Sequence, residues 1–399
     1  MALSILYIHH CGSFGGASRS LLELIRAFPE NEVKAHLITQ KGKVSEIFRE
    51  HGVEVIESGG ISQFDHTRFG FYRSLRWLIL LREIVYIPFT IWSMLKARRH
   101  WKNIDIVHVN EITNVLPILL AKVIFRCPLI VHVRSVQLVE KGCLRRKFVL
   151  WMLSKANAVV AIDSTVRNSL PEDIEINIIH NGFSLSQKAP INKDYQEDGF
   201  SGRPMKLVFV GGLIVMKGIL DFLHAAKHCA DNNMNVKFVV IGDISKKHKG
   251  FKAILLNKLG FFYDAIGYCG NYITEHNLED VIEFTGFTLD VESVYKAADV
   301  VCFPSHLNAV GRPVIEAALL KVPSIVAITG SAEDTIIHHQ TGLCIKEKDS
   351  VAIFEAIEYF YKQPTEIKRM GRAAFELAQI NFDIQKNAKK VLEVYKQCR

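Results

Sequence analysis

The sequence predicts an α/β protein with two domains, each built around a parallel β-sheet. Short apolar runs typical of buried strands alternate with longer segments of helical periodicity, which is the pattern of βα units. The chain has 399 residues, of which 49% are hydrophobic. Because a single core stops growing at about 250 to 300 residues, a chain of this length is expected to form two.

The charge and cysteine content narrow the class of protein. Residues 1–190 carry 24 Lys and Arg against 16 Asp and Glu, so the net charge of +8 comes from the first half. This predicts an anionic partner, either a membrane face or an acidic acceptor, and no helix-turn-helix, zinc-finger or RNA-binding motif points to nucleic acid. Eight cysteines without a Cys-x-x-Cys pair, and no basic leader before the first strand, predict a reduced, cytoplasmic protein.

Seven strands are expected in the first half, at residues 4–9, 34–39, 53–57, 104–109, 129–133, 158–162 and 176–179. A glycine-rich loop with Gly12, Gly15 and Gly16 follows the first strand and leads into a helix. Such a loop lets a phosphate approach the helix N-terminus. The full Gly-x-Gly-x-x-Gly spacing is absent, so an ordinary strand-to-helix loop is the alternative.

Polar side chains follow two of these strands. His108 closes one, and His132 and Arg134 close the next. Ligands of open α/β sheets bind outside the carboxyl ends of strands, so these residues are candidates for contact with an acceptor. For His108 the alternative is a structural hydrogen-bonding role.

Residues 71–101 differ from the rest, because aromatic and aliphatic side chains are interleaved with arginines. The longest uncharged run, 84–95, has 12 residues and contains Pro88, fewer than the ~20 needed to span a bilayer. We expect no transmembrane helix here. An interfacial helix on an anionic membrane is one interpretation, and a pair of core helices with solvated arginines is the other.

In the second half, strands are expected at 206–210, 236–241, 281–285, 300–303 and 324–327, with a turn and strand from Thr341. Gly211 and Gly212 precede Lys217, a lysine near a helix start that is favourable only beside an anion. The Gly286 turn offers backbone to a base. A helix is expected to open at 330–334, and two further helices finish the chain, the last from Asp383. Residues 244–276 suggest no function.

The stretch 299–327 contains the most informative pattern. A strand ends at Phe303, a loop runs from Pro304 to Arg312, and a helix is expected to open with Pro313 at its first position. The first-turn amides and the helix dipole favour an anion. Glu316 follows closely and is placed to accept hydrogen bonds from a sugar diol, so this stretch predicts a nucleotide pocket.

Together these motifs resemble the retaining, nucleotide-sugar-dependent glycosyltransferases called group 1 or family 4, over nearly the whole length. The matching segments are Phe209-Val-Gly-Gly, Lys217-Gly, Val281-x-Phe-x-Gly286 and Ala298-Asp-Val-Val-x-Phe-Pro-Ser305 with Gly311-x-Pro-Val-x-Glu316. The resemblance implies the GT-B fold, two facing Rossmann-like domains with a cleft between them. It implies an acceptor domain at 1–185, a linker at 186–204, a donor domain at 205–380, and a helix at 381–399 packing back on the first domain.

The resemblance also implies a role for each residue. Lys217 would bind the diphosphate of a UDP- or GDP-linked sugar and Glu316 its ribose, and His132 would lie near the reacting sugar. A glycan or lipid-linked acceptor is implied too, as is a cytoplasmic enzyme with the inner membrane face as an alternative site. No metal ion is expected, because the sequence has no His-Glu-x-x-His and no Asp-x-Asp stretch in a strand-end loop. Further donor contacts are expected from Gly15, Gly16, Gly212, Gly286, Asn308, Val310, Gly311 and Arg312, and acceptor contacts from His108 and Arg134.

Two residues depart from the family pattern. Asn308 replaces the first glutamate of Glu-x7-Glu, and Gly212 replaces an arginine, for which Arg312 is a candidate substitute. With Glu316 as the only carboxylate of the loop, no glycosyl-enzyme intermediate is expected, since a two-carboxylate mechanism needs a second. A nucleotide-sugar epimerase or phosphorylase on the same fold, or a non-catalytic binding subunit, are the alternatives.

Overall fold

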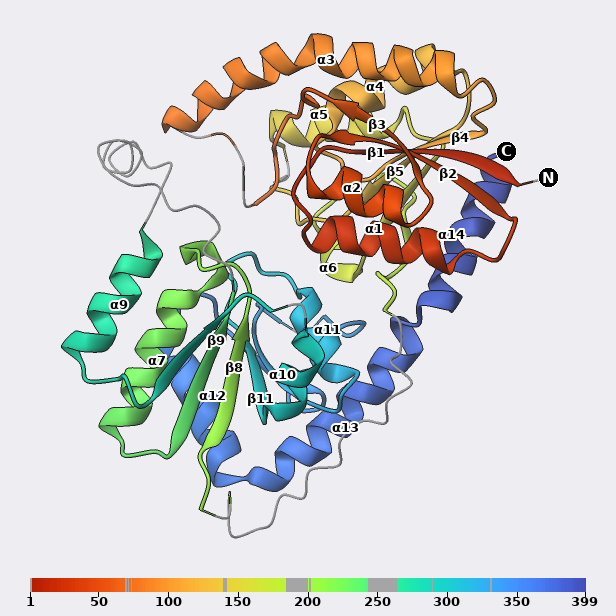
Figure 1. Cartoon of the computed structure of the whole chain (residues 1–399). Coiled ribbons are helices and arrows are strands. Elements are labelled where there is room, and N and C mark those ends of the chain that lie inside the picture. Colours follow the sequence, from red (N-terminus) through yellow and green to blue (C-terminus); the bar gives the residue numbers. More distant parts are fainter. Residues whose placement is uncertain are drawn as a thin grey trace. The chain divides into compact units, whose positions relative to one another are not determined.

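The computed structural model describes residues 2–68, 70, 72, 74–138, 142–183, 200, 202–242, 264–288, 290–330 and 332–399. Most of the expected linker 186–204 and of the segment 244–276 lies outside these residues. The chain divides into two compact units (Figure 1). Unit 1 comprises Met1–Ser184 and Phe382–Arg399, and unit 2 comprises Leu185–Asn381.

Unit 1 is built on a sheet with the strand order β3-β2-β1-β4-β5-β6-β7, in which every neighbouring pair is parallel. Its strands confirm the predicted ones to within one or two residues at each end. They are β1 (Leu3–His9), β2 (Val33–Gln40), β3 (Glu54–Ser58), β4 (Ile106–Val109), β5 (Leu129–Val133), β6 (Ala158–Ala161) and β7 (Asn177–Ile178).

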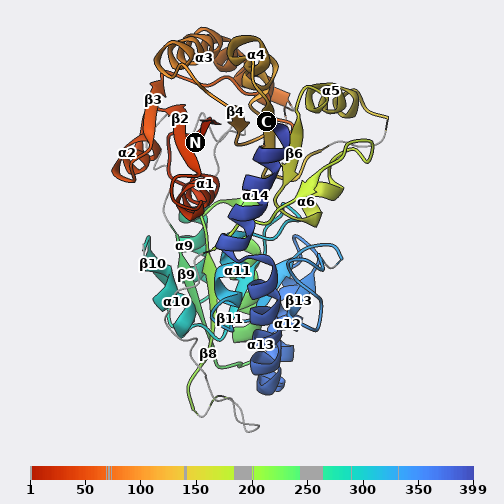
Figure 2. The ribbon, with the colours of Figure 1, turned by 90° about the vertical axis from the view of Figure 1, so that its right-hand side faces the viewer.

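Two layers of helices cover this sheet (Figure 2). One core contains side chains of α1 (Gly16–Ala27), α2 (Lys43–Glu50) and α14 (Ile384–Cys398). The other contains side chains of α3 (Ile79–His100), α4 (Val115–Phe125), α5 (Leu144–Leu153) and α6 (Ser164–Asn168), and a 3-10 turn, η1 (Ser74–Leu78), precedes α3. The two groups of helices lie on opposite faces of the sheet for a topological reason. Crossovers are right-handed, and the direction in which strands are added reverses after β3.

Unit 2 repeats the plan with the parallel strand order β10-β9-β8-β11-β12-β13. Its strands are β8 (Met205–Val210), β9 (Val236–Ile241), β10 (Ile282–Gly286), β11 (Val300–Phe303), β12 (Ser324–Ala327) and β13 (Gly342–Ile345). Its helices are η2 (Val215–Lys217), α7 (Ile219–Asp231), α9 (Ala265–Glu275), α10 (Val291–Ala297), α11 (Arg312–Ala318), α12 (Ser350–Lys362) and α13 (Pro364–Asn381).

Two helix predictions were wrong. The segment around 330–334 is a turn, in which Ala332 and Ile336 form an isolated bridge. β-Branched Thr335 and Ile336 follow there, and Ile336 packs into an apolar cluster with Phe303 and Val326. After β13 the described chain also forms three helices rather than two, because α12 ends at Lys362 and Pro364 begins α13.

The last helix, α14, packs on unit 1 although it follows unit 2 in the sequence. Its apolar face is buried against α1 and the sheet through Ala388, Val391, Leu392 and Tyr395. The Phe183 N–H donates to the Phe382 carbonyl oxygen at 2.9 Å and anchors the start of this segment. Unit 1 is therefore assembled from both ends of the described chain.

The strand orders place a topological switch in each sheet. It lies between β1 and β4 in unit 1 and between β8 and β11 in unit 2, because the chain builds outward from these pairs in opposite directions. Ligands of open α/β sheets bind beside such a switch, outside the carboxyl ends of the strands. The loops after β1, β4, β8 and β11 are therefore where functional side chains are expected.

Candidate functional site

In unit 2, the loops after β8 and β11 are joined at Gly218. This residue has φ +77°, and a Cβ there would lie 1.9 Å from the Pro304 carbonyl oxygen, so only glycine fits. The His306 N–H donates to the Met216 carbonyl oxygen at 3.0 Å, and His306 Nε2 lies 2.5 Å from Asp221 Oδ2 on α7. The structure thus brings the Lys217 turn and the 304–312 loop together at the switch.

The Lys217 ammonium is held in this junction. Its side chain is partly buried, and Nζ lies 5.5 Å from the centre of the Phe303 ring. Desolvation lowers the pKa of Lys217 from its ordinary value. Across the residues that the structure describes, Nζ forms no ion pair with a carboxylate. A desolvated cation without an anionic partner is a site where an anion binds favourably.

Asn308 shapes the loop after β11. It adopts the left-handed conformation with φ +49°, which asparagine tolerates better than glutamate, and its Oδ1 accepts a hydrogen bond from the Thr329 N–H at 2.6 Å. Gly311 closes the loop against Phe303, since a Cβ at Gly311 would lie 2.3 Å from that ring. Val310 is partly buried and packs against the apolar cluster that contains Phe303. Asn308 therefore supports the loop that leads into α11.

Helix α11 carries Glu316, the residue predicted to bind the ribose. It begins at Arg312, with Gly311 as its N-cap, so Pro313 is the second residue and not the first as predicted. Glu316 Oε2 accepts a hydrogen bond from the Tyr295 hydroxyl at 3.0 Å, and Oε1 lies 3.1 Å from Nη2 of Arg312. The carboxylate is thus oriented by two side chains. Arg312, the proposed substitute for the missing arginine, is engaged with this carboxylate.

Two predicted glycines lie along the same edge of the sheet. Gly286 ends β10 with φ +77°, and its carbonyl oxygen accepts from the Gly242 N–H at 3.2 Å. Gly242 in turn packs on the Gly211 carbonyl oxygen, so the ends of β10, β9 and β8 are linked. A Cβ at Gly212 would meet nothing within 4 Å. Packing therefore leaves room for a side chain at this position.

In unit 1, the glycine-rich loop occupies the switch beside β1. Gly15 is the N-cap of α1 and Gly16 its first residue, and neither a capping side chain nor an acidic residue lies in the first turn. Gly12 is fixed by packing, because a Cβ there would lie 2.6 Å from the Lys41 carbonyl oxygen. A Cβ at Gly15 would meet nothing within 4 Å. No side chain therefore caps the N-terminus of α1, and the space beside Gly15 is open.

A chain of buried polar side chains runs beneath the carboxyl ends of β4 and β5. The hydroxyls of Tyr7 and Tyr395 lie 3.1 Å apart, and the Tyr395 hydroxyl lies 2.6 Å from His108 Nδ1. His108 Nε2 lies 3.2 Å from His132 Nδ1. His108 is completely buried with a partner at each ring nitrogen, which favours its structural role over the predicted contact with an acceptor.

These hydrogen bonds determine which ring nitrogen of His132 carries the proton. Arg134 can only donate, and its Nη2 lies 3.4 Å from His132 Nδ1, so that nitrogen is an acceptor and the neutral ring carries its proton on Nε2. His108 Nε2 then donates to His132, and Tyr395 donates to His108. His132 Nε2 is buried and has no hydrogen-bond partner among the described residues. The arrangement therefore offers one N–H donor at the end of β5.

The histidines stay neutral at physiological pH. Burial lowers the pKa of His108 to about 3, and burial together with the Arg134 charge holds the pKa of His132 well below its ordinary value. His9 on β1 behaves in the same way, with burial as the largest cause. His132 is thus suited to donating a hydrogen bond, and not to taking up a proton.

Arg134 organises the neighbouring side chains. Its Nε donates to Asn110 Oδ1 at 2.7 Å, and Nη1 donates to Asn181 Oδ1 at 2.5 Å. Asn110 Nδ2 reaches His9 Nδ1 at 3.0 Å, which bridges the switch between β1 and β4. Sequence reasoning proposed Arg134 and His132 but not His9, Asn181 or Tyr395. The strand-end positions of His9 and Asn110 were an available indication.

Replacing Tyr395 with phenylalanine is expected to disturb this chain. His108 Nδ1 and the Tyr7 hydroxyl each lose a buried partner, which costs about 2 kcal/mol of stability. His108 then loses the hydroxyl that donates to its Nδ1, whereas Arg134 still holds the proton of His132 on Nε2. Nitrogen NMR of labelled histidine should show both rings protonated on Nε2 in the wild type, and in Tyr395→Phe the Nδ1 signal of His108 should shift while His132 keeps its tautomer. Tyr361→Phe, which alters a hydroxyl of unit 2 near the surface, is the control. A wild-type ring protonated on Nδ1 contradicts the assignment.

Glu111, next to Asn110, predicts a pH dependence of stability. It is buried, its Oε2 accepts from the Ser135 hydroxyl at 2.9 Å, and burial raises its pKa from 4.5 to about 7. The folded state therefore holds this proton more tightly than the unfolded state. Stability falls as pH rises from about 4.5 to 7, by about 3 kcal/mol from this group.

The melting temperature of Glu111→Gln should accordingly change less between pH 5 and about pH 8 than that of the wild type. Glu30→Gln, at an exposed position, is the matched control and should follow the wild type. Parallel pH profiles for Glu111→Gln and the wild type contradict the raised pKa.

No group of three or more His, Cys, Asp or Glu side chains is placed to hold a metal ion within the described ranges. The polar groups at the two switches include Lys217, Arg134 and Arg312, the neutral histidines of unit 1, amides and Glu316. Within each unit, the cations suit a phosphate, and the hydrogen-bonding groups suit hydroxyls.

Comparison with known proteins agrees with this fold. The family of Glycosyl transferases group 1 matches residues 191–377, and Glycosyltransferase Family 4 matches residues 14–187. Anabaena HepE, solved in complex with UDP and glucose, superposes with a TM-score of 0.72 at 18% identity, covering 99% of each chain.

Curated relatives match over shorter stretches. Capsular polysaccharide biosynthesis glycosyltransferase CapM of Staphylococcus aureus is 25% identical over 53% of this chain and 55% of its own. UDP-Gal:alpha-D-GlcNAc-diphosphoundecaprenol alpha-1,3-galactosyltransferase of Escherichia coli is 28% identical over 47% of this chain and 45% of its own. The chain thus spans about half the length of the curated relatives it matches.

Two parallel α/β units with polar residues at both switches define a protein of the GT-B class. The chain belongs to the group 1 glycosyltransferases, as the two matches covering residues 14–187 and 191–377 show.

Proposed function

We propose that this protein transfers a sugar from a nucleoside diphosphate to a glycan or lipid-linked acceptor. The observation that carries the proposal is the desolvated Lys217 ammonium, which lacks a carboxylate partner among the described residues and lies at the junction of the loops after β8 and β11. Lys217 would neutralise the diphosphate. Glu316, already oriented by Tyr295 and Arg312, would accept hydrogen bonds from the ribose.

The other donor contacts follow from the loops. Backbone at Val310, Gly311 and Gly286 would meet the sugar phosphate and the base, and Gly212 would contribute backbone alone. Gly15 and Gly16 would contribute phosphate contacts from unit 1. UDP is the favoured nucleotide, because HepE was solved with UDP and the E. coli relative is named for UDP-Gal. GDP is the alternative, and no metal ion is required by these contacts.

For the chemical step we propose retention of the anomeric configuration. Residues 304–315 contain no carboxylate, and Asn308 holds the loop. The acceptor hydroxyl oxygen would bond to the anomeric carbon on the face from which the diphosphate leaves, and its proton would pass to the departing phosphate oxygen. Lys217 stabilises the developing phosphate charge. The His132 Nε2–H would donate a hydrogen bond to a sugar hydroxyl, and Arg134 would hold the imidazole ring in place.

The test is a thermal-shift screen of the wild type against UDP, GDP, ADP and CMP. A bound nucleotide at a hundred times its dissociation constant stabilises the folded state by about 2.7 kcal/mol. One responding nucleotide identifies the donor class, and NMR of the product then reports whether its anomeric configuration matches the donor. Binding without transfer supports a binding subunit, no response contradicts the donor site, and a trapped covalent sugar adduct contradicts the mechanism.

A further inference from the structure

Helix α3 and the preceding turn carry an unusual concentration of exposed apolar side chains. Of the eighteen large apolar side chains that are exposed among the described residues, nine fall between Leu75 and Leu95. Leu81 is 62% exposed and Trp92 57%. The nine are Leu75, Trp77, Leu78, Leu81, Ile84, Val85, Phe89, Trp92 and Leu95. A surface helix ordinarily shows polar residues to water, so this outward face calls for a partner.

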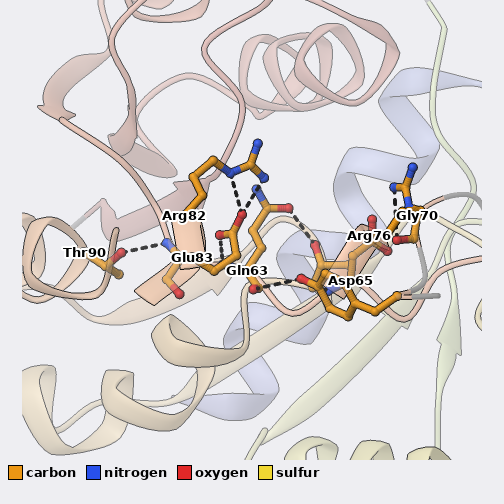
Figure 3. A network of polar contacts seen from close by, with 10 residues as sticks. Gln63, Asp65, Gly70, Arg76, Arg82, Glu83 and Thr90 are labelled. Carbon is orange, nitrogen blue, oxygen red and sulfur yellow. Dashed lines mark hydrogen bonds and ion pairs between the residues drawn. The ribbon is translucent and has the colours of Figure 1, made fainter. Parts of the chain in front are cut away.

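The opposite face of α3 is fixed to unit 1, partly by polar groups. Glu83 is buried, and its Oε2 accepts a hydrogen bond from the Gln63 N–H at 2.8 Å. The Thr90 hydroxyl accepts from the Ser62 N–H at 2.8 Å (Figure 3). Met94 and Ala97 continue this face into the core. At about 100° per residue, Glu83, Thr90, Met94 and Ala97 lie opposite the exposed strip.

Basic residues flank the strip. Between Arg82 and Lys96 the only charged residue is Glu83, whose carboxylate is buried beneath the helix and paired with Arg82. At the C-terminal end, a hollow of about 460 Å³ is lined by Trp92, Leu95, Lys96, Arg99 and His100. Lys96 Nζ lies 5.1 Å from the Trp92 ring centre. Cations beside an aromatic and a leucine suit a phosphate headgroup and the start of its acyl chains.

We propose that the exposed face of α3 docks on an anionic phospholipid membrane, with the helix lying in the plane of the interface. The strip from Leu81 to Leu95 is about 20 Å long and would enter the headgroup and acyl boundary. Lys96 and Arg99, which are exposed, would meet lipid phosphates. Helix α4 lies beside α3 and adds an exposed Val123 next to Lys122.

A membrane-spanning role fits less well. By length and composition, the segment Leu75–His100 is long and apolar enough to cross a membrane. The uncharged run 84–95 therefore underestimates the length of this apolar segment. Crossing would place Glu83, Thr90 and Ser93 in hydrocarbon and would break the hydrogen bonds that Glu83 and Thr90 accept from residues 63 and 62. Docking on a second copy is disfavoured because both surfaces would carry Lys96, Arg98 and Arg99.

The docking face also has a physical link to the candidate acceptor residues. Residues 62 and 63, held by α3, lead into a segment that pairs with the chain after β5. The Leu138 N–H donates to the His66 carbonyl oxygen and the Arg68 N–H to the Val136 carbonyl oxygen, both at 3.0 Å. One segment thus connects the docking face to the chain that follows the strand carrying His132. This arrangement suits an acceptor that resides in the membrane.

The experiment is vesicle flotation of the full chain with phosphatidylcholine vesicles and with vesicles containing roughly a third phosphatidylglycerol. The apolar variant is Leu81→Gln with Trp92→Gln, and the charge variant is Lys96→Gln with Arg99→Gln. The matched controls are Ile380→Gln, an exposed apolar position of α13, and Lys389→Gln with Lys390→Gln on α14. Melting temperatures should match the wild type, because every changed side chain is exposed.

The wild type and both controls are expected to float with the anionic vesicles and to release as salt is raised. The apolar variant should lose binding to both kinds of vesicle. The charge variant should lose roughly 30-fold in affinity for anionic vesicles only, at about 1 kcal/mol per basic residue. Wild-type protein that fails to float, or an apolar variant that binds like the wild type, overturns the proposal. A wild-type dimer that the apolar variant dissociates would reassign the face to self-association.

Discussion

Replacing Lys217 with alanine is expected to weaken binding of the donor nucleotide about a hundredfold. The ammonium is desolvated in the ligand-free protein and lies where the loops after β8 and β11 meet. Removing a charged hydrogen bond to phosphate costs about 3 kcal/mol, which corresponds to this change in affinity. Titration calorimetry with the responding nucleoside diphosphate measures it directly.

The variant also makes a second prediction that separates lost binding from lost folding. Because the Lys217 charge is desolvated and lacks a carboxylate among the described residues, alanine should leave the ligand-free melting temperature unchanged or slightly raised. Lys227→Ala is the matched control, since Lys227 lies on α7 and pairs with Asp231. It should bind the nucleotide like the wild type. Equal affinities for Lys217→Ala and Lys227→Ala would remove Lys217 from the donor site.

Gly218→Ala is expected to destabilise unit 2 by about 3 kcal/mol or more. The residue has φ +77°, and the added Cβ would meet the Pro304 carbonyl oxygen, a backbone atom that cannot rotate away. The two loops must then separate, so donor binding should fall together with the melting temperature. Thermal unfolding with and without nucleotide measures both effects.

Gly212→Ala serves as the control for this substitution. A Cβ at Gly212 meets nothing within 4 Å, so the same chemical change in the same loop should leave the melting temperature nearly unchanged. A Gly218→Ala protein as stable as Gly212→Ala would show that the loops after β8 and β11 are not packed as described.

The fold was largely predictable because both sheets are parallel and buried. Strands of such sheets are mostly apolar runs, and the runs at 129–133, 236–241 and 300–303 have the same first and last residues as the observed strands. Helix boundaries were less predictable. The Gly-Ser-Ala-Glu-Asp stretch from Gly330 has the composition of a helix start, but Ile336 is buried in a cluster with Phe303, and tertiary packing decided the outcome.

The candidate site was predictable where topology places it and unpredictable where distant side chains meet. Lys217, Glu316 and His132 follow from strand ends and helix starts. The Arg312 and Glu316 pair has the i, i+4 spacing of a helical ion pair, which was available in the sequence but not used. The contact between Tyr7 and Tyr395 joins residues 388 positions apart, and no local pattern encodes it.

The position of Tyr395 also has a consequence for the order of folding. Helix α14 belongs to unit 1, yet it is synthesised after every residue of unit 2. Until it emerges from the ribosome, the sheet of unit 1 lacks one of its covering helices and His108 lacks its hydroxyl partner. The hydrogen-bond series from Tyr395 through His108 to His132 is therefore completed only after unit 2 has been synthesised, so that the protein completes unit 1 last.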